Sequence, residues 1–239
     1  MKRSSFEVKN LKRNSLKLSY NSEIMDLRIL NFEQTRKDLK ASFQRDLLAI
    51  HTIRTLDLLE AIQEKLLAQL RERFSIYAPL AARSLEEAGF IEAIHHPKEE
   101  ALSVALRNED FTVLESYTVL LKELKKEYDH QFAYLNGLLT VLCPRFTALA
   151  TPLLAGRLLE RAGSLQHLAC LPSSTIQVLG AEKSLFRHLK TGSKPPRFGV
   201  LFQHPSIANA TESEKGKTAR KLANKLSIAV KQDYFGEKQ

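Results

Sequence analysis

The chain has 239 residues and a formal net charge of +9, from 36 lysines and arginines against 27 acidic residues. This length holds one or two domains with a real core. The two cysteines, Cys143 and Cys170, lack CxxC or CxxH spacing, which excludes a disulfide scaffold and a cysteine zinc site. No apolar run approaches the ~18 residues of a membrane span, and the basic N-terminus lacks the apolar core of a secretory signal. We therefore expect a cytoplasmic protein.

The positive charge is concentrated at both ends of the chain. The first 20 residues hold 6 lysines and arginines against 1 acidic residue, and residues 164–239 hold 12 against 5. Residues 21–163 hold 18 against 21. This asymmetry indicates a nucleic acid or an anionic membrane surface as the partner. Residues 1–44 are predicted to be a basic, flexible segment, whose first 20 residues are either an RNA-binding arm or a disordered tail.

Residues 45–144 carry two long apolar series that predict a coiled-coil hairpin. The spacing of the first averages about 3.4 residues, close to the ~3.5 of a coiled-coil seam. It consists of Ile53, Leu56, Leu59, Ile62, Leu66, Leu70, Phe74 and Tyr77. The second consists of Phe111, Leu114, Tyr117, Leu121, Leu124, Tyr128, Phe132, Leu135, Leu138 and Leu142. Two long helices with one narrow seam each should pair antiparallel. The alternative is that both belong to one compact bundle.

Residues 145–239 predict a second, helical domain. Residues 145–169 form a leucine-rich helix pair, and a further helix is expected over 174–189. Gly180 interrupts that helix. A glycine inside a helix costs about 1 kcal/mol relative to alanine, so this one indicates close approach of another backbone or a ligand. The short apolar run 199–202 is expected to form a turn or a strand.

Two helices of this domain concentrate positive charge on one face. On the first face, Lys183, Arg187 and Lys190 recur at i, i+4 and i+7, opposite Leu185, Phe186 and Leu189. The second face, in the last helix of the chain, consists of Lys217, Arg220, Lys221 and Lys225, with Leu222, Leu226 and Ala229 on the other side. Two basic faces joined by a proline-rich turn predict a surface that binds a phosphate backbone.

Three motifs of this domain resemble those of a known family. They are GAEKSLFRHL at 180–189, GVLFQHPSI at 199–207 and GKTARKLANKLSIAVKQDYF at 216–235. Together with the segment RDLLAIHTIRTLDLLEAIQEKLLAQLRERFSIYAPL, they resemble the Nop-domain family of box C/D ribonucleoprotein core proteins, in particular its archaeal type. The resemblance covers residues 45–236. It implies an all-α fold, in which a long antiparallel coiled-coil hairpin precedes a helical Nop RNA-binding domain with a short turn or strand insertion.

The resemblance also implies how the chain works. Family members dock onto a composite surface made by a kink-turn RNA and the small ribosomal-like protein bound to it. The implied RNA contacts are Lys183, Arg187, His188, Lys190, Gln203, His204, Lys217, Arg220 and Lys221. The implied partner-protein interface is Gly180, Ala181, Glu182, Pro205 and Ile207. The coiled coil would form a homodimer through Leu59, Ile62, Leu66, Leu70, Leu121, Leu124, Tyr128 and Leu135. The domain core would be held by Leu185, Phe186, Leu189 and Leu201.

The chain departs from the family at its start. Archaeal members usually begin with a separate domain that binds fibrillarin, the methyltransferase of the particle. Only about 44 residues precede the matching region here, and we expect that domain to be missing. Whether fibrillarin is recruited therefore stays open.

No catalytic or metal-binding constellation is found in the sequence. The GKT at 216–218 lacks the glycine that a Walker A motif needs five positions earlier, where Thr211 stands. His95 and His96 with Glu99 and Glu100 do not match a zincin, and a solvated loop explains them better. We expect a protein that is not an enzyme and needs no cofactor.

Two functions remain open on this basis. The first is an RNA-binding scaffold of a box C/D guide ribonucleoprotein that supports guided 2′-O-methylation of RNA, with no membrane partner. The alternative is a coiled-coil assembly factor whose Nop-like domain has lost its affinity for RNA.

Overall fold

The structure is a computed structural model that describes residues 27–39, 45–96 and 107–236. The chain divides into two units, Met1–Gln44 and Arg45–Gln239, and each is described by itself. In the first unit, residues 27–39 form a helix whose side chains are all exposed. The basic leader 1–20 and the pair Glu99 and Glu100 lie outside the described residues, so the expectations for them stay predictions.

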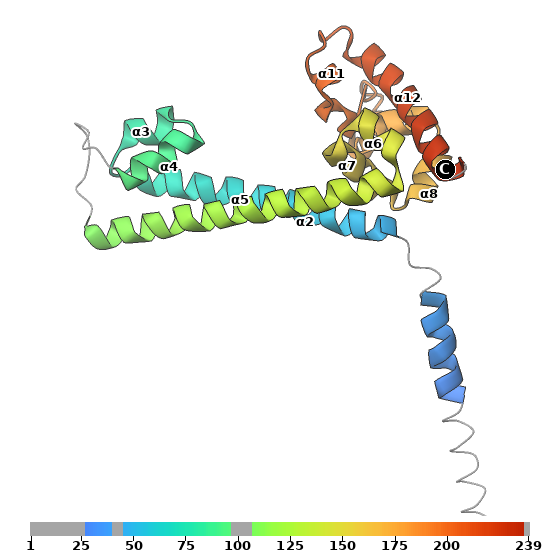
Figure 1. The fold of residues 1–239 in the computed structure, drawn as a ribbon. Coiled ribbons are helices and arrows are strands. Elements are labelled where there is room, and N and C mark those ends of the chain that lie inside the picture. Colours follow the sequence, from blue (N-terminus) through green and yellow to red (C-terminus); the bar gives the residue numbers. More distant parts are fainter. Residues whose placement is uncertain (1–26, 40–44, 97–106, 237–239) are drawn as a thin grey trace, which may run out of the picture. The chain divides into compact units, whose positions relative to one another are not determined.

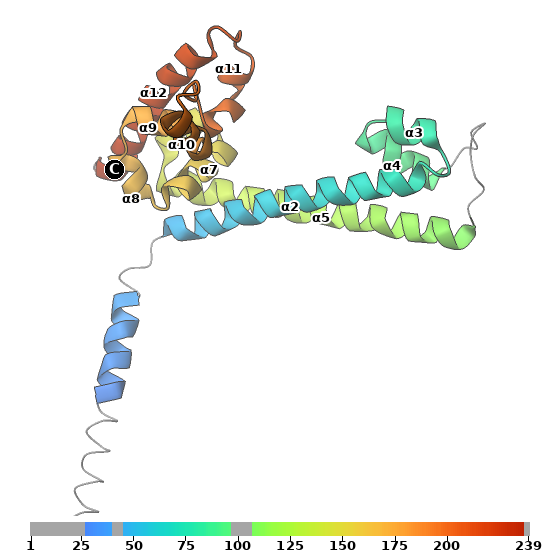
Figure 2. The same ribbon diagram turned by 180° about the vertical axis from the view of Figure 1, so that it is seen from behind.

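Every regular element described in the second unit is helical (Figures 1 and 2), which confirms the predicted all-α fold. The elements are α2 (Arg45–Phe74), α3 (Pro79–Ser84), α4 (Glu87–His95), α5 (Asn108–Leu142), α6 (Pro144–Ala150), α7 (Pro152–Ala162), α8 (Leu165–Cys170), α9 (Ser173–Val178), α10 (Glu182–Thr191), the 3₁₀ turn η1 (Val200–Gln203), α11 (Pro205–Ala208) and α12 (Lys215–Phe235). None of these helices is long and apolar enough to cross a membrane.

The short insertion at 199–202 is the turn η1 and not a strand. The N–H groups of Gly199 and Val200 donate to the carbonyls of Gln177 and Leu179, at 2.9 Å each. The chain then turns at once, because the N–H of Phe202 donates back to the carbonyl of Gly199 at 3.2 Å. Two bonds without a continuing ladder do not make a strand.

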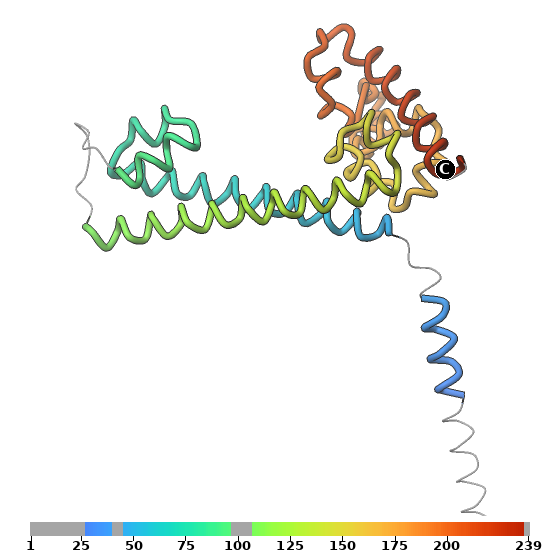
Figure 3. The backbone as a smooth tube through the Cα atoms, in the orientation of Figure 1, coloured from blue at the N-terminus to red at the C-terminus, as the bar shows by residue number. Residues whose placement is uncertain are grey.

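The predicted hairpin is present: α2 and α5 run side by side in opposite directions and wind past each other (Figures 1 and 3). Their predicted seam is fully buried only towards its two ends. Ile53, Leu56, Leu135 and Leu139 lie in one core, and Leu70, Phe74, Leu114 and Leu121 lie in another. Between them Leu59, Ile62, Leu66, Leu124 and Tyr128 are half-buried, since two helices alone cannot cover both sides of a seam.

This burial corrects part of the predicted self-association surface. Leu70, Leu121 and Leu135 are 1%, 5% and 0% exposed within the single chain. They contact the chain's own helices and offer no surface to a second copy. The five half-buried residues of the seam keep their place in the prediction.

At the end of the hairpin that carries α3 and α4, one arginine joins three elements. The Arg71 guanidinium donates to the carbonyls of Ala82 at 2.7 Å and Leu85 at 2.9 Å. It also lies 4.5 Å from the centre of the Phe90 ring, which packs edge-on against Phe74. These carbonyls at the end of α3 have no intrahelical partner, so the guanidinium satisfies them.

The other end of the hairpin shares one hydrophobic core with α6 to α9, η1, α11 and α12. The helix pair expected over 145–169 is three short helices, since Pro144 and Pro152 stand at helix starts, where proline is favoured. The carboxylate of Asp46, 5% exposed, accepts from the N–H of Leu165 at 2.8 Å and joins the starts of α2 and α8.

Asp233 of α12 caps α6 in a similar way. Its two carboxylate oxygens accept from the N–H of Phe146 at 2.8 Å and of Arg145 at 3.3 Å. These two groups belong to the first turn of α6, where backbone N–H groups have no intrahelical acceptor.

We predict that Asp233→Ala lowers the free energy of unfolding by about 1–2 kcal/mol, because the first turn of α6 loses its acceptors. Urea denaturation followed by circular dichroism measures this. Asp129→Ala is the matched control, because Asp129 is exposed on α5 and accepts no hydrogen bond from another described side chain. Equal losses from the two variants would contradict the capping role.

We also predict that native protein reacts at one of its two thiols. Burial raises the pKa of Cys143 to about 11, and its side chain is 1% exposed, whereas Cys170 is exposed. Only a thiolate attacks a disulfide reagent. Titration with Ellman's reagent at pH 8 should therefore give one thiol per chain, and two in urea. Two thiols without denaturant would place Cys143 outside the core.

Candidate nucleic-acid interface

The helix expected over 174–189 is two helices, α9 and α10, that meet at Gly180. Gly180 has φ +87°, a left-handed conformation that favours glycine. A Cβ at this position would lie 2.8 Å from Cγ1 of Val200. The glycine therefore marks close approach of another part of the chain, as its place in the sequence predicts. Its N–H donates to the Glu182 carboxylate at 2.7 Å, which closes the turn before α10.

Helix α10, labelled in Figure 2, has no buried residue and makes no extended contact with another described helix. Its three predicted cations, Lys183, Arg187 and Lys190, are exposed and form no ion pair with a described carboxylate. They lie on a helix that is amphipathic in sequence, yet no described helix packs extensively against its apolar side.

This exposure corrects the predicted domain core. Phe186 is 62% and Leu189 is 70% exposed, and Leu185 is half-buried, so of the four expected core residues only Leu201 lies in the core, at 0%. Helix α10 has the apolar face that its sequence predicts, but the domain does not bury that face. The helix thus presents cations and apolar side chains together.

The imidazole rings of His188 and His204 both contact backbone groups of the chain. His188 Nδ1 contacts the carbonyl of Ser193 after the end of α10. His204 is the N-cap of α11: its Nδ1 accepts from the N–H of Ser206 at 3.2 Å. Its Nε2 then carries the proton and donates to the carbonyl of Leu149 at 3.1 Å. The ring of His204 is therefore fixed and half-buried, and its predicted RNA contact would replace or extend these bonds.

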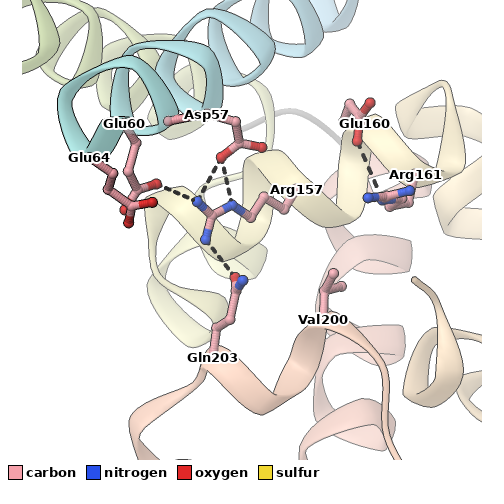
Figure 4. A pocket seen from close by; sticks show the side chains of 9 residues that line it. Asp57, Glu60, Glu64, Arg157, Glu160, Arg161, Val200 and Gln203 are labelled. Atoms are coloured by element: carbon pink, nitrogen blue, oxygen red, sulfur yellow. Dashed lines mark hydrogen bonds and ion pairs between the residues drawn. The ribbon is translucent and has the colours of Figure 1, made fainter. Parts of the chain in front are cut away.

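Gln203 is exposed, but its amide oxygen accepts from Nη1 of Arg157 at 2.7 Å. Arg157 lies at the centre of the group shown in Figure 4. Its Nε and Nη2 donate to Asp57 at 2.9 and 2.6 Å, and Nη2 also donates to Glu60 at 3.0 Å. Burial opposes the charged form, but the hydrogen bonds and charges of Asp57 and Glu60 outweigh it and raise the pKa of Arg157. One side chain thus links α2, α7 and η1.

A groove of about 320 Å³ lies beside this group. Its lining includes four carboxylates, from Asp57, Glu60, Glu64 and Glu160, against the two guanidinium groups of Arg157 and Arg161. Sequence reasoning missed this arrangement, because Arg157 and Asp57 are 100 residues apart in the chain. No motif marks either of them.

The remaining predicted residues divide by exposure. Lys217, Arg220 and Lys221 are exposed on α12, as expected for a basic face. Gly180, Glu182 and Pro205 are exposed, and Ala181 is half-buried. Ile207 is 0% exposed and belongs to the core, which corrects its predicted place in a partner interface. Since α11 has only four residues, periodicity could not assign its faces.

An aromatic pair that was not singled out in the sequence lies at the same turn. The rings of Phe198 and Phe202 stack at 5.3 Å between centroids, and Nζ of Lys215 lies 5.2 Å from the Phe202 ring. Lys215 also pairs with Glu212 at 2.8 Å, which lowers the pKa of that carboxyl. These contacts hold the turn η1 against the start of α12.

The described residues contain no group of three or more His, Cys, Asp or Glu side chains placed to hold a metal ion. What they do contain is an all-helical domain with two exposed basic helices and a fixed turn. Such a surface is typical of proteins that bind nucleic acid.

Comparison with known proteins identifies the family. Residues 87–239 match the family described as Nop, snoRNA binding domain, fibrillarin. The chain belongs to the Nop family, as the motifs predict.

The relatives are both archaeal and eukaryotic. An uncharacterized NOP5 family protein of Methanocaldococcus jannaschii is 31% identical over 233 residues, which are 86% of this chain and 56% of that protein. Human nucleolar protein 56 is 39% identical over 128 residues, 54% of this chain and 22% of the relative. The chain thus spans about half the length of the first relative and less of the second.

Among solved structures, one from the crystal structure of a fibrillarin/Nop5p complex aligns with a TM-score of 0.53 and 25% identity. The alignment covers 99% of this chain and 80% of that one. The similarity therefore includes α2 and α5 as well as the helices from α6 onward.

We predict that Arg157→Met lowers the free energy of unfolding by about 1–2 kcal/mol, since it removes charge-assisted bonds from a side chain that is 20% exposed. Amide hydrogen exchange at η1 should also become faster, because Gln203 loses its donor. The control is Arg161→Met, since the Arg161 side chain is 52% exposed and its ion pair with Glu160 is 3.6 Å long. A loss no larger than that of the control would show that the network does not hold the turn.

Proposed function

We propose that the chain is an RNA-binding scaffold of a box C/D guide ribonucleoprotein, which docks on a kink-turn RNA and the ribosomal-like protein bound to it. The observation that carries the proposal is the exposure of α10. A folded domain gains nothing from leaving Phe186 and Leu189 uncovered, since burial of a large apolar side chain is worth about 1.5–3 kcal/mol. Exposed apolar residues on a helix are typical of a surface that a partner covers.

The two kinds of side chain on α10 fit the two parts of the proposed ligand. Lys183, Arg187 and Lys190 have no carboxylate partner among the described residues, and a phosphate backbone would supply one. Phe186 and Leu189, with Gly180 to Glu182 before them, would contact the ribosomal-like protein. Gln203, His204, Lys217, Arg220 and Lys221 would extend the contact with RNA from η1 and α12.

The names of the relatives support this reading. The family is described as Nop, snoRNA binding domain, fibrillarin, and the similar solved structure comes from a fibrillarin/Nop5p complex. For the present chain we propose the same kind of particle, in which fibrillarin methylates the ribose and this chain positions the RNA. Direct recruitment of fibrillarin and a cytoplasmic location stay predictions.

A second candidate function, a protein-assembly factor, is favoured by the surface of the hairpin. Leu58, Val119 and Val141 are 60%, 55% and 71% exposed on α2 and α5, outside the half-buried seam. This surface suits a homodimer or another protein partner. In the scaffold it would space two RNA-bound halves, and in the assembly factor it would be the whole function.

A gel-shift titration on a box C/D kink-turn RNA separates the two functions. It is done with and without the ribosomal-like protein prebound, at two salt concentrations. We expect a supershift that needs the prebound protein and weakens with salt. Addition of fibrillarin then tests its recruitment. No supershift at micromolar protein would refute the scaffold and favour the assembly factor.

We predict that Lys183→Glu with Arg187→Glu abolishes the supershift and leaves the melting temperature almost unchanged, because both side chains are exposed on α10. The matched control is Lys122→Glu with Lys125→Glu, the same charge reversal on exposed residues of α5. Loss of the supershift in both variants would indicate a general effect of charge. An unfolded α10 variant would mean that the two side chains are misplaced.

A further inference from the structure

The hydrogen bond between Arg157 and Gln203 fixes which end of the Gln203 amide is available to a ligand. Gln203 is the last residue of η1 and is exposed, and its amide oxygen accepts from Nη1 of Arg157 at 2.7 Å (Figure 4). A guanidinium group can only donate, so the atom that contacts Arg157 must be the oxygen. The amide nitrogen therefore lies away from Arg157, and it donates to no described residue. Its N–H groups are free to donate to a ligand.

Arg157 itself is fully engaged inside the chain. Its Nε donates to Asp57, and its Nη2 donates to Asp57 and Glu60, which leaves Nη1 for Gln203. The side chain is only 20% exposed, and two carboxylates balance its charge. Arg157 is therefore poorly placed to contact a phosphate, and what it can do for a ligand it does through Gln203.

The neighbouring His204 fixes the same turn from another side. Its Nδ1 accepts from the N–H of Ser206, and its Nε2 donates to the carbonyl of Leu149 in α6, so both ring nitrogens are used within the chain. Of these two predicted RNA contacts, Gln203 is thus the one with free hydrogen-bond donors. Because the turn is joined to α6 by His204 and to α7 by Arg157, the direction of these donors is set before a ligand binds, which lowers the entropic cost of binding.

We propose that Arg157 is a positioning residue for RNA, which orients the Gln203 amide so that its N–H groups donate to an uncharged oxygen of the ligand. The groove beside Gln203 is lined by four carboxylates against two guanidinium groups, a balance that disfavours a phosphate there. A ribose 2′-hydroxyl or a base carbonyl carries no charge and accepts from an amide. The inference rests on the proposed function in taking RNA as the ligand.

The test is a double-mutant cycle in the supershift titration, with the ribosomal-like protein prebound to the kink-turn RNA. The variants are Arg157→Met, Gln203→Met and the two combined. We expect each single variant to weaken binding about fivefold to tenfold, as for one net hydrogen bond, and the double variant to bind no more weakly than Gln203→Met. Two controls should keep the affinity: Gln69→Met, on an exposed residue of α2, and Asp233→Ala, which we expect to lose as much stability as Arg157→Met.

Salt dependence separates positioning from a direct contact with phosphate. Arg157→Met should leave the slope of log affinity against log salt unchanged, whereas Lys183→Met should make it shallower by about one. A shallower slope for Arg157→Met would mean a direct phosphate contact and would overturn the proposal. Losses that add in the double variant, or an equal loss in Asp233→Ala, would also overturn it, because Arg157 would then act only through the stability of the fold.

Two sets of kink-turn RNAs identify the acceptor, one with single 2′-deoxy nucleotides and one with single methylphosphonate linkages. A 2′-deoxy position at which wild type and Gln203→Met bind equally assigns a 2′-hydroxyl, and the absence of such a position in both sets assigns a base. Equal binding at a methylphosphonate would mean a phosphate acceptor and contradict the proposal. Wild-type protein without any supershift would refute the scaffold and this inference together, whereas a supershift with additive losses would refute the role of Arg157 alone.

Discussion

The pairing of α2 with α5 is the constraint on which the second unit depends. Each helix can turn only one stripe towards the other, so the pair by itself leaves Leu59, Ile62 and Leu66 half-buried. Full burial is reached only where further helices add a layer. At one end α3 and α4 supply it, and at the other the helices from α6 onward do so. The helices from α6 onward thus complete a core that the hairpin begins, and they are fixed to α2 and α5 by that shared core.

Hydrogen bonds between residues far apart in the sequence join the helices of this arrangement to one another. The Asp46 bond to Leu165 spans 119 residues, and the Asp233 bond to Phe146 spans 87. Both satisfy backbone groups at helix starts that would otherwise be buried without a partner. Arg157 fixes a surface turn through side chains instead, since its guanidinium donates to Gln203 of η1 and to Asp57 of α2. The helices from α6 to α9 and α12 are therefore joined on several sides, whereas α10 makes no extended contact with another described helix.

The sequence predicts what depends on local pattern and misses what depends on a distant neighbour. The seams of α2 and α5 and the break at Gly180 follow from spacing and from glycine chemistry, and the structure confirms them. Spacing also predicts the apolar face of α10, but whether another element covers Phe186 and Leu189 is a tertiary question that periodicity does not answer. Ile207 is the opposite case, a core residue in a helix too short to show a period. No local sequence pattern singles out Arg157.

Acidic and basic side chains gather on different surfaces, which lie on the two sides of η1. Four carboxylates line the groove where α2 and α7 meet η1, and they disfavour phosphate on the hairpin side of the turn. Exposed cations without a described carboxylate partner gather instead on α10 and α12, beyond the turn. In the proposed scaffold, an RNA backbone that follows the favourable potential would avoid this groove, and the exposed Leu58, Val119 and Val141 of the hairpin would stay accessible to protein. In the proposed scaffold, phosphate would be repelled from one side of η1 and attracted to the other, so that RNA and a second protein would not compete for the same surface.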